Sequence, residues 1–198
     1  MINMALSGRL NRGRLLSYKR WVFIAIFLFG IGLIFGSTAS DGMAGFMSEE
    51  IAALEELVTF LSSLPPALLA LFIFIKNVSA LLISFVFSPI FCLAPILALV
   101  VNGWLISFVS ALVIEEKSLG FVLAGLLPHG IFELPALIIG QAAALSFGSL
   151  AVLALFKRER RSLLLPGLRR NLRYLMIACA LLLPAAIIET YITPLLIT

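Results

Sequence analysis

Long apolar segments separated by short charged segments dominate the chain. The three clearest run over residues 21–39, 67–113 and 176–198. A helix of about 20 apolar residues crosses a bilayer, and each of these segments reaches or exceeds that length. The second segment is long enough for two crossings, with a turn expected between Ser88 and Pro95. The pattern therefore predicts an all-α fold, a polytopic transmembrane helix bundle.

The segment that follows residue 117 is longer than one crossing requires. Residues 118–156 are almost twice the length of one span, yet the charge pattern described below allows only one net crossing. Pro128 and Gly130 interrupt the segment, and both residue types disfavour a continuous helix. We therefore expect a broken or re-entrant half-helix over residues 119–127, followed by a full helix from about Ile131.

A last crossing is predicted over residues 174–191. The bundle then has about five full spans plus the half-helix near Pro128–Gly130. Moving one weak boundary would give six spans, and the sequence leaves that alternative open.

Composition supports the membrane class. Hydrophobic residues make up 62% of the chain and charged residues 12%, whereas soluble domains are about 25% charged. The formal net charge of +4 does not indicate nucleic-acid binding, because Lys and Arg gather beside the apolar segments, as in other membrane proteins. We expect contact with membrane lipid and no nucleic-acid partner.

The charged residues also predict an orientation in the cell membrane. Basic residues gather in residues 9–20 and 157–173, and acidic residues gather in residues 41–56. Because Lys and Arg in short loops stay in the cytoplasm, we expect the N-terminus and a basic loop 157–173 to be cytoplasmic. Residues 1–198 would then form a single integral membrane domain with an extracytoplasmic amphipathic segment at 41–64.

That amphipathic segment should contain a helix over residues 48–62. Ser48 can cap it, and apolar residues recur at helical spacing as far as Leu61. Glu55 and Glu56 lie on the opposite face, so we expect this helix to dock on protein rather than to bind lipid. The expected partners are a second copy of the chain or other membrane proteins.

Polar residues inside the predicted spans form the candidate site. The chain's one histidine, His129, lies four residues before Glu133 within an apolar stretch, so the two side chains would share a helix face. Ionisable groups at membrane depth are costly unless partnered, which makes them functional-site candidates. The predicted intramembrane polar cluster comprises Asn77, Asn102, His129, Glu133 and Glu189.

Three of these residues suit a divalent metal ion. One imidazole and two carboxylates are ligands of zinc, manganese and non-haem iron, so we expect His129, Glu133 and Glu189 to converge. Two carboxylates close together in low dielectric repel unless a cation or an imidazolium separates them. Alternatively, the same side chains only hydrogen-bond between helices and stabilise the bundle. Both interpretations stay open, and no catalytic residue is assigned.

Four short motifs resemble those of the stage II sporulation protein M family of integral membrane proteins. They are LLPHGIFELPA at 126–136, Lys76-Asn77, Asn102-Gly103 and IETYITP at 188–194. The Pro-His-Gly block is the specific one, whereas Lys76 stands where the family usually has a first asparagine. The resemblance implies a multi-pass membrane fold, and the family's namesake works with cell-wall hydrolases during engulfment.

Two functions are therefore considered. The first is a non-enzymatic scaffold or permease-like subunit in which the polar cluster organises the helices. The alternative is an ion- or metal-dependent intramembrane transporter or hydrolase that uses His129, Glu133 and Glu189. The chain has no Gly-x-Ser-x-Gly motif, P-loop or dinucleotide-binding motif, which favours the non-enzymatic function.

Overall fold

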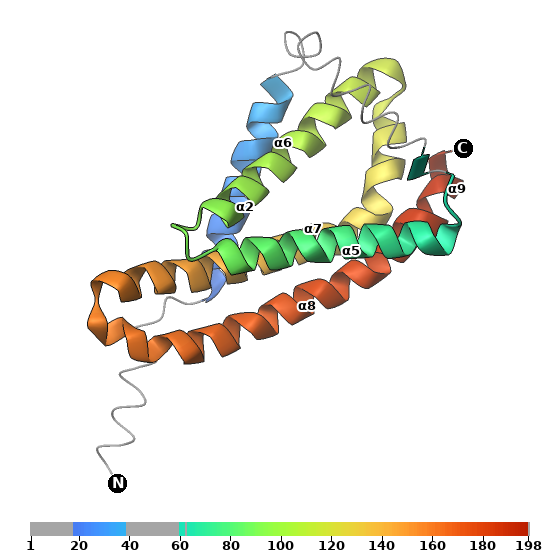
Figure 1. Cartoon of the computed structure of the whole chain (residues 1–198). Coiled ribbons are helices and arrows are strands. Elements are labelled where there is room, and N and C mark those ends of the chain that lie inside the picture. Colours follow the sequence, from blue (N-terminus) through green and yellow to red (C-terminus); the bar gives the residue numbers. More distant parts are fainter. Residues whose placement is uncertain (1–17, 39–59, 62, 198) are drawn as a thin grey trace.

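The computed structural model describes residues 18–38, 60, 61 and 63–197, in which the regular elements are all helices (Figure 1). In chain order they are α2 (Tyr18–Thr38), α5 (Pro66–Phe87), α6 (Leu93–Glu116), α7 (Leu119–Phe156), the 3-10 helix η1 (Arg158–Leu163), α8 (Leu164–Tyr191) and α9 (Thr193–Ile197). Five segments of these residues are long and apolar enough to cross a membrane: α2, α5, α6, α7 and the combined Arg158–Tyr191. The predicted all-α bundle of five spans is confirmed.

Two sequence predictions fall largely outside the described residues. The acidic helix at 48–62 lies there except for residues 60 and 61, and so do the basic residues before Tyr18. Both stay predictions.

The helix ends follow local sequence. α5 begins with Pro66 at its first position, where the fixed φ of proline suits a helix start. Ser88–Cys92 forms the turn before α6, in which Phe91 and Cys92 adopt φ values of 49° and 57°. At the next turn Ser118 caps α7, since its Oγ accepts a hydrogen bond from Phe121 N at 3.2 Å. Both turns lie where the sequence predicts them.

Helix α7 corrects the expected break at Pro128–Gly130. Residues 119–156 form one continuous helix with Pro128 and Pro135 inside it. Figure 1 shows that its axis turns sharply between the part drawn in yellow and the part drawn in orange. Each proline removes one backbone hydrogen bond and pushes against the preceding turn, which bends a helix without ending it when neighbouring helices support it.

Helix α8 begins earlier than the sequence suggested. The region predicted as a basic loop, 157–173, contains η1 and the first ten residues of α8, Leu164–Arg173. Leucine and arginine are good helix formers, so the charges at 169, 170 and 173 do not prevent the helix from starting at Leu164.

The second half of α7 is the core of the bundle. All but one of the buried residues of α7 lie between Ala136 and Ala154. One cluster joins this half to α5 and α8 through Leu81, Ala143 and Leu182, and another joins it to α2 and α6. The first half, by contrast, contributes only Gly130 to the buried residues. It is therefore free to line a pocket.

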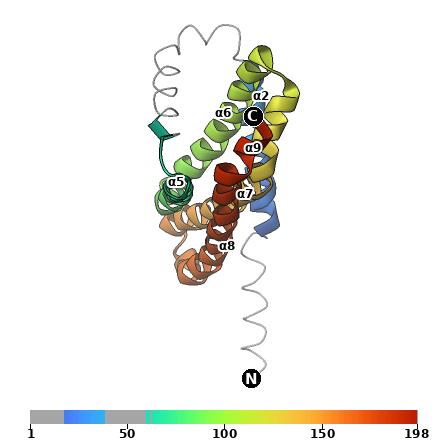
Figure 2. The same ribbon diagram turned by 90° about the vertical axis from the view of Figure 1, so that its right-hand side faces the viewer.

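Helices α2 and α6 pack side by side through glycines (Figure 1). In the turned view of Figure 2 most of α2 lies behind α6 and α7. A Cβ at Gly32 would collide with the backbone of Val100, and one at Gly103 would collide with the carbonyl of Phe29. Small residues let helix backbones approach closely in membranes. This pair forms one wall of the bundle.

Candidate metal centre at the bend of helix α7

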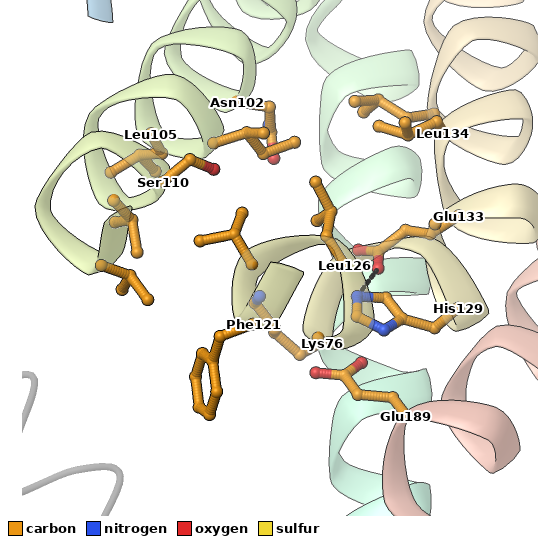
Figure 3. A pocket seen from close by; sticks show the side chains of 17 residues that line it. Lys76, Asn102, Leu105, Ser110, Phe121, Leu126, His129, Glu133, Leu134 and Glu189 are labelled. Carbon is orange, nitrogen blue, oxygen red and sulfur yellow. Dashed lines mark ion pairs between the residues drawn. The ribbon is translucent and has the colours of Figure 1, made fainter. Parts of the chain in front are cut away.

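Three of the predicted residues meet where α7 bends. His129 and Glu133 come from successive turns of α7, and Glu189 comes from the last turns of α8 (Figure 3). One ligand atom from each of the three lies within 4.8 Å of the others. His129 Nε2 is 3.8 Å from Glu133 Oε2. The helical spacing of the first pair and the packing of α8 along α7 together produce this convergence.

Hydrogen bonds from neighbouring helices hold two of the three side chains. Asn77 Nδ2 on α5 donates to Glu133 Oε1 at 3.1 Å. His129 Nδ1 lies 3.4 Å from Thr193 Oγ1 on α9. Thr193 Oγ1 in turn donates to the carbonyl oxygen of Ile188 at 3.3 Å. Residues of α5, α7, α8 and α9 therefore take part in the arrangement.

The hydrogen bonds of Thr193 bear on the roles of the two imidazole nitrogens. A threonine hydroxyl has one proton, and Thr193 gives that proton to Ile188. If His129 Nδ1 donates in this contact, a neutral ring directs its Nε2 lone pair toward Glu133 Oε2, whereas a protonated ring directs an N–H there. A lone pair facing a carboxylate oxygen is unfavourable unless a cation or a proton lies between them.

A pocket of about 530 Å³ opens beside the cluster. Its walls come mainly from apolar residues of α6 and the first half of α7, and its polar lining residues are Lys76, Asn102, Ser110, His129, Glu133 and Glu189. The side chains of His129 and Glu133 retain exposed fractions of 13% and 31%. Both can therefore be reached from the pocket.

Asn102 is separate from the other predicted residues. It lines the same pocket from α6, but its Nδ2 donates to Ala98 O on its own helix at 2.7 Å. The structure therefore brings together four of the five residues of the predicted cluster, Asn77, His129, Glu133 and Glu189.

Two further residues belong to the site. Lys76 extends into the pocket from α5 (Figure 3), and Thr193 holds the imidazole. The sequence marked Lys76 as a possible sixth member of the polar cluster and did not place Thr193 in it. The signal for Thr193 was its position one helical turn after Glu189.

The donor set fits a small divalent cation. Zinc takes nitrogen and oxygen ligands at about 2.0–2.2 Å, which places tetrahedral ligands about 3.3–3.6 Å apart. The donor atoms here lie within 4.8 Å of one another, so a closing movement of about 1 Å would bring them to that spacing. Three protein ligands leave one position for water or another ligand.

Comparison with known proteins gives two matches. Residues 25–194 match the family model described as stage II sporulation protein M. A protein of Methanocaldococcus jannaschii, described as uncharacterised, is 24% identical over 174 residues, which cover 87% of this chain and 93% of the relative. No solved structure matches.

Proposed function

Because the chain belongs to the stage II sporulation protein M family, we propose that it is a non-enzymatic membrane component that binds a divalent cation at His129, Glu133 and Glu189. The three residues come from two helices. A bound ion would therefore join α7 to α8 and fix their relative position. This role combines the predicted scaffold with the predicted metal site.

The observation that supports the proposal is the convergence of one imidazole and two carboxylates, whose ligand atoms lie within 4.8 Å of one another. His129 Nδ1 lies 3.4 Å from Thr193 Oγ1, and His129 Nε2 lies 3.8 Å from Glu133 Oε2. A histidine ligand held through its other nitrogen is the usual arrangement at metal sites. Hydrogen bonding between helices would explain the contacts of Asn77 and Thr193, but it does not require the carboxylates of Glu133 and Glu189 to lie close together.

The experiment measures metal content in purified protein. Wild-type protein, purified without chelator and incubated with zinc, should hold about one equivalent by elemental analysis. His129→Ala and Glu189→Gln should each lose it. Asn102→Ala is the matched control, because Asn102 lines the same pocket and contacts none of the three ligands.

Two results would overturn the metal proposal. One is wild-type protein that takes up none of zinc, manganese or iron at neutral pH. The other is equal metal content in the wild type, His129→Ala and Glu189→Gln, since the ion would then bind elsewhere.

A metal-dependent transporter or hydrolase is a second candidate. The pocket of about 530 Å³ beside the cluster is large enough for a small ligand, and a metal with an open position can activate water. This candidate requires that loss of the metal stops uptake or hydrolysis of a substrate by protein in liposomes. Liposomes in which metal-free protein and metal-loaded protein behave alike would exclude it.

The proposed orientation places the N-terminus and residues 157–163 in the cytoplasm. Four helices of spanning length lie between them, and an even number of crossings returns the chain to the same side. Single cysteines introduced at 41–63 and 158, in a variant without Cys92 and Cys179, test this. Labelling of residues 41–63 from the cytoplasmic side would reverse the orientation.

A further inference from the structure

We infer that the first turns of α8 bind a phosphate group, at a site separate from the metal centre. Arg169, Arg170 and Arg173 line a cavity of about 300 Å³ together with Leu165 and Pro166. Residues three and four positions apart lie on one face of a helix. The three guanidinium groups therefore approach the cavity from one helix.

The positive charge of this cavity is not balanced by any described acidic residue that lines it. Among the described residues that line it, three are arginines and none is acidic. Guanidinium groups bind phosphate through paired hydrogen bonds.

Arg170 supplies an independent observation. Its Nη2 donates to Ser146 Oγ on α7 at 3.1 Å, which holds the guanidinium in a fixed position. Its Nε is buried and has no hydrogen-bond partner among the described residues. Because this Nε is shielded from solvent, a phosphate would bind through the other guanidinium N–H groups of the three arginines.

The surroundings allow two sources of phosphate. Leu165 is 57% exposed beside the arginines, so an acyl chain of a phospholipid could lie against it while the headgroup enters the cavity. Basic pockets at a membrane surface bind anionic headgroups in this way. Inorganic phosphate offers the same oxygens without the chain.

The experiment compares binding of both sources to full-length protein in detergent. Phosphatidylglycerol, phosphatidylcholine and inorganic phosphate are titrated separately at constant ionic strength, with binding followed by native mass spectrometry and by melting temperature. Wild-type protein should bind phosphatidylglycerol or phosphate at least tenfold more tightly than phosphatidylcholine. Arg169→Gln combined with Arg173→Gln should remove that preference.

The control removes two equivalent charges outside the cavity. Lys157 and Arg158 are exposed and do not line it, so Lys157→Gln combined with Arg158→Gln should retain the preference. A lysine pair at 169 and 173 keeps the charge without the guanidinium geometry and should bind more weakly than wild type. This variant serves if the glutamine pair does not fold.

The outcomes distinguish phospholipid from inorganic phosphate and test whether the arginine-lined cavity is the binding site. Competition of phosphate with phosphatidylglycerol supports one shared site, and binding of only one of them identifies the source. Equal loss of binding in the two glutamine pairs would overturn the inference, because attraction would then depend on overall charge alone. Absence of any preference in wild-type protein would overturn it as well.

Discussion

Asn77 on α5 donates a hydrogen bond to Glu133 on α7, with 3.1 Å between Nδ2 and Oε1. The bond restrains the carboxylate that also faces His129. Asn77 therefore contacts the candidate site without being one of its three candidate ligands. Residues that orient ligands in this way commonly tune metal affinity.

Asn77→Ala should weaken zinc binding by about 10–100-fold, because outer partners of metal ligands have effects of that size. Competition with a coloured zinc chelator measures the change. Ser79→Ala on the same helix is the control and should keep wild-type affinity. Unchanged affinity in Asn77→Ala would show that Glu133 does not need this bond to bind metal.

Lys76→Met should strengthen zinc binding by about tenfold. The lysine ammonium lines the same pocket as the three ligands, and a positive charge there opposes a second cation by about 1–2 kcal/mol. Methionine has similar length and no charge. If Lys76→Met instead abolishes binding, the lysine stabilises the site and the charge argument is wrong.

Gly32→Ala should destabilise the protein by about 1–3 kcal/mol, because overpacking of a close helix contact has that cost. The added Cβ would meet the backbone of α6 at Val100 and Trp104. Gly30→Ala is the matched control, since a Cβ there has no neighbour within 4 Å. Thermal unfolding in detergent distinguishes the two, and equal melting temperatures would contradict the packing described for α2 and α6.

Ser84 Oγ donates to Gln141 Oε1 at 2.5 Å in the buried core. Ser84→Ala should cost about 1–3 kcal/mol, because it leaves the buried glutamine without that partner. Adding Gln141→Leu should restore part of the loss, since neither side chain then needs a partner. If the double variant loses more unfolding free energy than the two single variants lose when their losses are added, this account is wrong. Thermal unfolding of all four proteins completes the cycle.

The sequence indicates the candidate site because its residues are chemically unusual where they occur. One histidine and one carboxylate four residues apart in an apolar stretch predict a shared helix face, and α7 places His129 and Glu133 in that way. Glu189 is distant in the sequence, and its charge within a span marks it as a candidate. Whether the group binds metal stays a prediction.

Other features depend on tertiary packing, which local patterns do not describe. Pro128 and Gly130 favour a break by their intrinsic preferences, yet packing of neighbouring helices keeps α7 continuous through them. Asn102 looks equivalent to Asn77 in sequence, but it points along its own helix. Its side chain finds a carbonyl one turn away, which the sequence alone does not distinguish from a contact between helices.

Because α7 bends, a change in the bend angle would rotate its first half relative to its second half. From Leu119 to Glu133 the helix rises about 21 Å at 1.5 Å per residue, and the cluster of His129, Glu133 and Glu189 lies at the base of this half. A change of about 10° in the bend would displace Leu119 by about 4 Å, with the buried half from Ala136 to Ala154 as the fixed support. An ion bound between His129 and Glu189 would lie at the bend of α7. A small displacement of these two residues would change the bend angle and move Leu119 by a larger distance.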